Sequence, residues 1–208
     1  AKHDIHAMAH VTGGALVDVL IGQGGADTLN GGVGRDQMSG GDGSDTYFAD
    51  LFNEGVSETN AVLLTGGNDL VNFIGTSGTY TLAANLERLT LGGTSAINGN
   101  GNSLANTLIG NAAANTLNGS TGIDNMSGGD GSDTYFADVF NDVVTETNAV
   151  LATGGTDQVY FSGTIGTFTL GLNIEKLTLA GGSAINGTGN MLANTIIGNG
   201  ASNVISGG

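Results

Sequence analysis

Ten segments of nine residues share three fixed columns, and this period constrains the fold more than any other feature. Position 1 of every segment is Gly, position 6 is Asp or Asn, and position 8 is apolar. The segments fill residues 13–48 and 101–136 and begin again at 189. Residues 40–110 also align without a gap with 128–198, so equivalent residues lie 88 positions apart. A nine-residue unit cannot bury a core alone, so several units must stack.

Each segment predicts one turn followed by one short strand. The Gly-rich first six residues permit a backbone with positive φ, and the last three are extended. In a three-residue strand only the middle side chain points inward, and here it is the apolar position 8. Stacked units therefore predict an all-β fold, a right-handed parallel β-solenoid with a thin continuous core. The position-8 residues are Leu20, Leu29, Met38, Tyr47, Leu108, Leu117, Met126, Tyr135, Ile196 and Ile205.

Two longer stretches separate the blocks of segments. Apolar residues alternate in them, as in "TYTLAANLERLTL", which predicts irregular coils of the same solenoid with bulging loops near 50–66 and 138–154. A helix at "ANLERL" is the alternative. We expect one continuous solenoid whose parts are an N-terminal segment 1–12, block 1 at 13–48, connector 1 at 49–100, block 2 at 101–136, connector 2 at 137–188 and a partial block 3 at 189–208. The chain starts without Met and stops within a repeat, so we expect a longer or processed parent protein.

Composition excludes several classes of function. With 19 Asp and Glu against 4 Lys and Arg, the formal net charge is −15, which argues against nucleic acid or an anionic membrane as a partner. No apolar run is long enough to span a membrane. The chain has no Cys, its three His lie at one end, and its basic residues are scattered. We therefore predict that it is not an enzyme.

The acidic column predicts a cation site. Carboxylates that recur on successive turns lie about 4.8 Å or two layers apart and repel one another unless they are neutralised. Ca²⁺ fits best, because it accepts six to eight oxygen ligands in flexible geometry. The alternative is that each side chain caps its own turn. The column consists of Asp18, Asp27, Asp36, Asp45, Asn106, Asn115, Asp124, Asp133, Asn194 and Asn203.

The segments "GGVGRDQMS" and "GGDGSDTYF", the latter present twice, resemble the nonapeptide of the RTX (repeat-in-toxin) calcium-binding β-roll family. The resemblance implies type I secretion and folding driven by extracellular Ca²⁺. It further implies that alternate segments share an ion, which pairs Asp18 with Asp36, Asp27 with Asp45, Asn106 with Asp124, and Asn115 with Asp133. The position-4 glycines complete the implied sites: Gly25, Gly34, Gly43, Gly122 and Gly131.

The implied sites are not equivalent. The Asp27/Asp45 pair has Gly at position 4 of both turns, whereas Leu16 replaces that Gly in the turn of Asp18. In block 2, neutral Asn106 and Asn115 lower the ligand charge, so we expect weaker binding there or none. Asn stacks offer side-chain hydrogen bonds between turns instead. Block 3, with Asn at position 6 in both segments, is the poorest candidate.

Other acidic residues and the histidines allow further hypotheses. Asp42 and Asp130, at position 3, could add a ligand or be solvated. Asp69 and Asp157, in "TGGNDLV" and "TGGTDQV", resemble a shortened repeat with a ligand. His3, His6 and His10 have the spacing of a helical Zn²⁺ or Cu²⁺ site, although an unstructured terminus is the more common reason for such a sequence.

Together these patterns predict a secreted, extracellular Ca²⁺-binding structural repeat protein. We expect it to be part of a bacterial surface, matrix, filament or adhesin assembly, with copies of itself or neighbouring repeats as end-to-end partners. The alternative is an accessory secretion and folding module of a larger secreted lipase, protease or polysaccharide epimerase. Carbohydrate binding along the acidic face is a third possibility.

Overall fold

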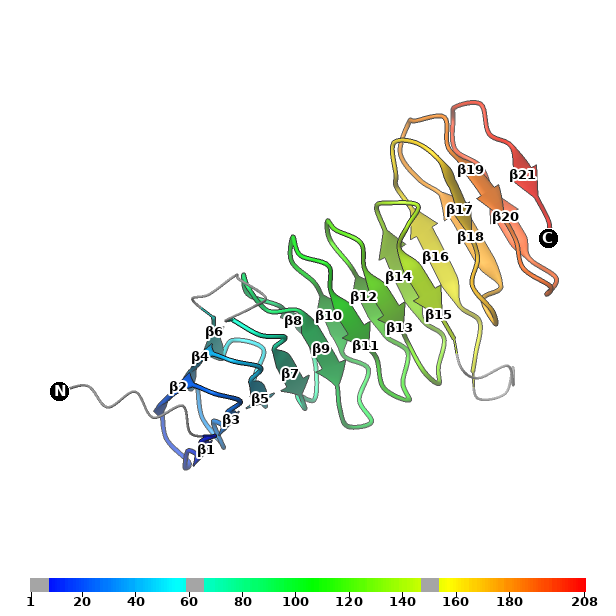
Figure 1. Ribbon diagram of the computed structural model, residues 1–208. Coiled ribbons are helices and arrows are strands. Elements are labelled where there is room, and N and C mark those ends of the chain that lie inside the picture. The colour runs from blue at the N-terminus through cyan, green and yellow to red at the C-terminus, as the bar shows by residue number, and fades with distance from the viewer. Residues whose placement is uncertain (1–7, 59–65, 147–153) are drawn as a thin grey trace.

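The computed structural model describes residues 8–58, 66–146 and 154–208 as a stack of β-coils, with no helix in these ranges (Figure 1). Each complete coil contributes one strand to each of two sides of the solenoid, and all pairs are parallel. The odd side consists of β1 (His10–Thr12), β3 (Thr28–Asn30), β5 (Thr46–Ala49), β7 (Leu70–Phe73), β9 (Arg88–Leu91), β11 (Thr107–Ile109), β13 (Asn125–Ser127), β15 (Val143–Thr145), β17 (Thr167–Thr169), β19 (Asn186–Thr188) and β21 (Ile205–Ser206).

The even side consists of β2 (Val19–Gly24), β4 (Gln37–Asp42), β6 (Gly55–Ser57), β8 (Thr79–Thr81), β10 (Asn98–Asn100), β12 (Thr116–Asn118), β14 (Thr134–Ala137), β16 (Gln158–Phe161), β18 (Lys176–Leu179) and β20 (Thr195–Ile197). Strands β1 to β15 of the odd side form one sheet of eight, and β8 to β20 of the even side form one of seven. Two three-stranded sheets, β2-β4-β6 and β17-β19-β21, continue the two sides. The predicted parallel β-solenoid is therefore confirmed.

The register shows that one coil holds two nonapeptide segments. Thr28 is paired with Thr46 and Val19 with Gln37, each 18 residues later. Some connector coils are longer, since Thr46 pairs with Leu70 after 24 residues. The strands on either side of such a longer coil keep their parallel pairing.

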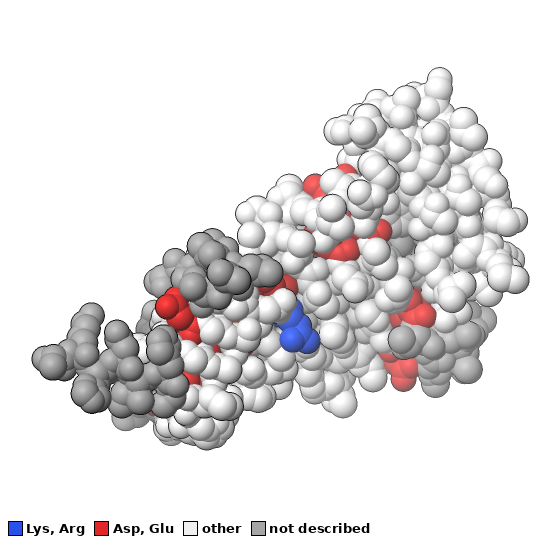
Figure 2. Space-filling model, viewed as in Figure 1, with Lys and Arg blue, Asp and Glu red and all other residues white. Residues whose placement is uncertain are grey.

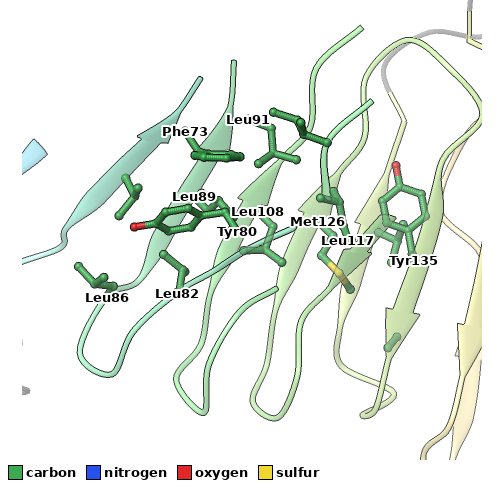
Figure 3. Close-up of a cluster of buried hydrophobic side chains, with 14 of the residues drawn as sticks. Phe73, Tyr80, Leu82, Leu86, Leu89, Leu91, Leu108, Leu117, Met126 and Tyr135 are labelled. Atoms are coloured by element: carbon green, nitrogen blue, oxygen red, sulfur yellow. The ribbon is translucent and has the colours of Figure 1, made fainter. Parts of the chain in front are cut away.

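The core is a single column of inward side chains between the two sides. Strands such as β3 and β12 bury only their middle residue, Leu29 or Leu117, and both are fully buried. Eight of the ten position-8 residues are buried, whereas Ile196 is half-buried and Ile205 is 47% exposed. Figure 3 shows how aromatic and aliphatic side chains from successive coils fill this column.

The connectors continue the same core. Tyr80, Leu82, Leu86, Leu89 and Leu91 are all buried, as their alternation predicts. The alternative of a helix at "ANLERL" is wrong, because these residues form a turn that leads directly into β9. Parts of the predicted bulging loops, residues 59–65 and 147–153, lie outside the described residues.

The 88-residue unit contains nine strands, an odd number, so equivalent residues of its two copies lie on opposite sides. Thr46 begins β5 on the odd side, and its equivalent Thr134 begins β14 on the even side. The chain therefore presents the turn "GGDGSD" first at one edge of the solenoid and then, four and a half coils later, at the other.

Candidate metal centres

The position-6 side chains form ladders along both edges of the solenoid. Each lies just before a strand, and where it is Asp its Oδ1 commonly accepts the backbone N–H of the position-6 residue one coil earlier. Asp45 accepts from Asp27 at 2.7 Å and Asp36 from Asp18 at 2.8 Å. In block 2, Asp124 accepts from Asn106 and Asp133 from Asn115, both at 2.7 Å. The members of every pair implied by the resemblance are thus neighbours on adjacent coils.

The ladders do not stop at the blocks but run on into the connectors. Asp69 Oδ1 accepts from the Asp45 N–H at 2.7 Å, and Glu87 Oε2 accepts from the Asp69 N–H at 2.9 Å. The second copy repeats this with Asp157, which accepts from Asp133 at 2.7 Å, and with Glu175, which accepts from Asp157 at 2.8 Å. Asp69 and Asp157, which the sequence identified as possible ligands in a shortened repeat, therefore belong to the ladders.

Sequence reasoning missed four members of the ladders: Glu87, Glu175, Glu54 and Asp142. The last two occupy position 6 of the degenerate segments "ADLFNEGVS" (49–57) and "ADVFNDVVT" (137–145). Asp142 Oδ1 accepts from the Asp124 N–H at 2.9 Å, and Val144 at position 8 is buried. The signal was available, because positions 6 and 8 are kept while the Gly of position 1 is replaced by Ala.

The second carboxylate oxygen of most column aspartates is left without a partner. Five Oδ2 atoms have no hydrogen-bond donor, although their residues are at most 2% exposed: Asp27, Asp36, Asp45, Asp124 and Asp133. A buried carboxylate oxygen without a partner is costly. A hard cation with several oxygen ligands fits these atoms, and Ca²⁺ has that preference.

The position-4 glycines supply the matching backbone. All five adopt positive φ, as the Gly-rich turns predict: Gly25, Gly34, Gly43, Gly122 and Gly131. At Gly43, φ is 121°, and a Cβ would strike the carbonyl oxygen of Gly25 in the coil below. Close backbone approach between coils therefore requires Gly here and leaves the carbonyls of adjacent turns near one another.

Carboxylates gather into clusters where the blocks meet the connectors. Among the described residues, three groups of carboxylates have ligand atoms that lie within 4.8 Å of one another. We name each group by one member: the Glu58 cluster (Asp45, Glu58, Asp69), the Glu146 cluster (Asp133, Glu146, Asp157) and the Asp142 cluster (Asp124, Asp138, Asp142). In the first copy, the residues equivalent to the Asp142 cluster each keep an unpartnered oxygen: Asp36 Oδ2, Asp50 Oδ1 and Glu54 Oε1. Figure 2 shows acidic residues in separate patches along the solenoid, with few basic side chains near them.

Burial disfavours the charged form of these carboxylates. It raises the pKa of Asp45 to about 6 and that of Asp69 to about 8, with a further increase from neighbouring carboxylates. In the second copy it raises the pKa of Glu146 to about 8 and that of Asp157 to about 7. In the Glu58 and Glu146 clusters, burial therefore favours protonated carboxyl groups, and a cation that binds there competes with protons.

The Asn residues of the column close their turns differently. Asn115 is 2% exposed; its Nδ2 donates to the Ile97 carbonyl at 2.6 Å, and its Oδ1 accepts from the Asn111 N–H at 2.8 Å. Asn106 does the same with Leu86 and Asn102, at 3.0 and 2.7 Å. Hydrogen bonds of the protein itself thus satisfy both ends of each amide, which favours a structural role over the implied ligand role.

Asn at position 2 strengthens this second kind of turn. Asn111 donates to the carbonyls of Gly92 and Ser95 in the coil below, at 3.1 and 2.9 Å, and accepts from the Ala113 N–H at 2.9 Å. Equivalent contacts recur in the "GN" turns of blocks 2 and 3, made by Asn102, Asn190 and Asn199. The side-chain amides of these turns therefore join adjacent coils by hydrogen bonds.

The remaining candidates are less well placed. Asp18 is only half-buried, and its Oδ2 accepts from the Gly14 N–H at 2.6 Å. At position 3, Asp42 is exposed and Asp130 half-buried. Of the three histidines, His10 lies exposed in β1, whereas His3 and His6 fall outside the described residues.

Comparison with known proteins supports the repeat assignment. The model of the RTX calcium-binding nonapeptide repeat (4 copies) matches residues 12–47, 100–135 and 109–144. The third match ends just past Asp142 and so covers residues 137–144 of the degenerate segment. Searches of curated proteins and of solved structures found no match. In the described ranges no helix is long and apolar enough to cross a membrane.

Proposed function

Because the chain carries RTX calcium-binding nonapeptide repeats, we propose that it is a secreted structural solenoid whose coils are locked together by Ca²⁺. The observation that carries this proposal is the set of five buried, unpartnered Oδ2 atoms in the position-6 ladders at the two edges of the solenoid. RTX repeats bind Ca²⁺ and form a structural, non-catalytic fold, and proteins that contain them are typically secreted.

In this proposal the ions lie between turns one coil apart. Asp27 and Asp45 would hold one Ca²⁺ ion, with carbonyl oxygens from the turns of Gly25 and Gly43. Asp36, at the opposite edge of the solenoid, and its equivalent Asp124 in the second copy would each be a ligand of a further ion. Ca²⁺ is preferred to Mg²⁺ because irregular turns with many carbonyls suit its flexible coordination. The ion would neutralise stacked carboxylates that otherwise repel one another.

The blocks and connectors of the chain would then act as one solenoid in a bacterial surface, matrix, filament or adhesin assembly. End-to-end contact with neighbouring repeats or further copies belongs to the same proposal. A solenoid coil can stack on any coil of similar outline, because each contacts only its neighbours.

Calorimetric titration of the chelator-treated chain with Ca²⁺ tests the ion. We expect saturable uptake together with a gain of β-structure in circular dichroism, because the ion removes the repulsion between stacked carboxylates that favours opening of the turns around them. A chain that takes up no Ca²⁺ and whose spectrum does not change would refute the proposal. Electron microscopy in Ca²⁺ tests the assembly, by distinguishing filaments from single rods.

A second candidate is an accessory module of a secreted lipase, protease or polysaccharide epimerase, because RTX repeats are themselves a separate folding unit. The full-length gene distinguishes the two: an adjacent catalytic domain favours the module, and many 88-residue units favour an assembly. Carbohydrate binding along the acidic face is testable on a glycan array.

A further inference from the structure

Glu58 and Glu146 break the strictest rule of the repeat. Both stand where the next segment would have its position-1 Gly, since each follows the last residue of a degenerate segment. Their carboxylates are buried, at 6% and 5% exposure. Glu58 accepts from the N–H groups of Gly40 and Gly41, at 3.1 and 3.2 Å, in the coil below. Glu146 repeats this with Gly128 and Gly129, both at 3.2 Å.

An unpartnered oxygen points to the same place. Asp45 is 1% exposed, and its Oδ2 has no hydrogen-bond donor. This atom lies so close to Gly40 that a Cβ there would collide with it, and Gly40 is the residue whose N–H contacts Glu58. Asp69 completes the cluster from the next coil. In the second copy, Asp133 Oδ2 has the same relation to Gly128 and is equally without a donor.

We propose that the Glu58 cluster and the Glu146 cluster are two additional Ca²⁺ sites, each built from three side-chain carboxylates. This inference rests on the proposed Ca²⁺-loaded solenoid but assigns a different kind of site. In the nonapeptide turns the protein offers position-6 carboxylates and backbone carbonyls, whereas here a Glu side chain enters from position 1. The clusters lie where each block passes into its connector, at the start of the longer coil.

Charge decides the preference of these clusters among cations. Each cluster brings three carboxylates within 4.8 Å of one another, and all three residues are buried. A hard cation is attracted in proportion to its charge, so a trivalent lanthanide should bind more tightly than Ca²⁺. Tb³⁺ is therefore a suitable probe of the same oxygen ligands.

Two tyrosines lie beside the clusters and can report on the probe. The hydroxyl oxygen of Tyr47 accepts from the Gly40 N–H at 2.6 Å, and that of Tyr135 accepts from the Gly128 N–H at 2.6 Å. The chain has four Tyr and no Trp, so tyrosine-excited Tb³⁺ emission reports on ions close to a tyrosine ring. A third tyrosine, Tyr80, interacts electrostatically with Glu54, so the emission that is lost when Tyr47 and Tyr135 are replaced, and not the total emission, reports on the two clusters.

The experiment compares three double variants of the whole chain, with bound Ca²⁺ counted at equilibrium and Tb³⁺ emission measured under tyrosine excitation. Glu58→Gln with Glu146→Gln should reduce the bound Ca²⁺ by two ions per chain and lower the emission. Tyr47→Phe with Tyr135→Phe should keep the ions and lower the emission. The matched control is Thr76→Lys with Thr164→Lys, which changes the net charge by the same amount at exposed turn residues outside the clusters and should keep both signals.

Each outcome decides one claim. If the unaltered chain takes up no Ca²⁺, the proposed function itself fails. If it takes up Ca²⁺ and the Glu58/Glu146 variant binds as many ions, only the two additional sites are refuted. An equal loss in the Thr76/Thr164 control would attribute the effect to net charge and would also overturn them. Undiminished emission in the tyrosine variant would place the Tb³⁺ elsewhere, against the assignment.

Discussion

Replacing Asn115 by Asp should make the stability of its turn depend on calcium, whereas hydrogen bonds alone close that turn in the native chain. In the native chain the Asn115 Nδ2 donates to the Ile97 carbonyl at 2.6 Å and to Asn111 Oδ1 at 3.2 Å. A carboxylate has no donor, so Asn115→Asp leaves a buried carbonyl without its partner and places negative charge beside it. The same carboxylate would face Asp133, whose Oδ1 accepts from the backbone N–H of residue 115 at 2.7 Å.

The magnitude follows from the lost hydrogen bond. Leaving one buried acceptor unsatisfied costs about 1–3 kcal/mol, so we expect a local loss of about 2 kcal/mol in chelator. Such a loss corresponds to about a 30-fold increase in the population of the open turn. Added Ca²⁺ should reverse much of it, because the new Asp pairs with Asp133 as Asp27 pairs with Asp45.

Amide hydrogen exchange measures this opening at the Asn111 N–H, which is hydrogen-bonded to the side chain of residue 115 at 2.8 Å. We expect about 30-fold faster exchange in chelator and a return toward the native rate in Ca²⁺. The control is Asn118→Asp, because the Asn118 Oδ1 accepts from the Ser120 N–H at 3.0 Å and Asp preserves that bond. Unchanged exchange in chelator, or no response to Ca²⁺, would refute the reasoning.

Three further predictions concern the charge, the core and the turns. In chelator the urea midpoint should rise as the pH falls from about 8 to 4.5, because burial in the folded chain raises the pKa of Glu54 and of Glu146 from 4.5 to about 8 and so favours their protonated forms. Ca²⁺ affinity should fall over the same pH range. A urea midpoint that falls instead would contradict this reasoning. Leu117→Ala should cost about 2–5 kcal/mol in urea unfolding, since the side chain is fully buried, whereas Leu51→Ala, at a side chain 40% exposed, should cost far less. Gly43→Ala should lower the unfolding free energy by more than about 1 kcal/mol, because φ is 121° there; an unchanged urea midpoint would show that the turn tolerates a Cβ.

Local sequence rules were sufficient for the solenoid and for most of its acidic ladders. The position-8 column predicted the inward side chains, because in a three-residue strand only the middle one can point to the core. The resemblance to the RTX nonapeptide predicted which position-6 residues are neighbours, and the structure places them on adjacent coils because one coil holds two segments and pairs residues 18 apart. These features depend on a period, which a sequence displays directly.

Tertiary structure decided what depends on contacts between coils. That Asp45, Glu58 and Asp69 converge could not be read from their spacing, because the Glu side chain reaches back to Gly40 in the coil below. That Asn115 satisfies both ends of its amide depends on the position of the Ile97 carbonyl. The opposite placement of the two copies follows from counting nine strands in each unit, which requires the connector strands. The sequence by itself determined the coil and its period; only the stacked structure decided which oxygens and amides meet, because those contacts join residues one coil apart.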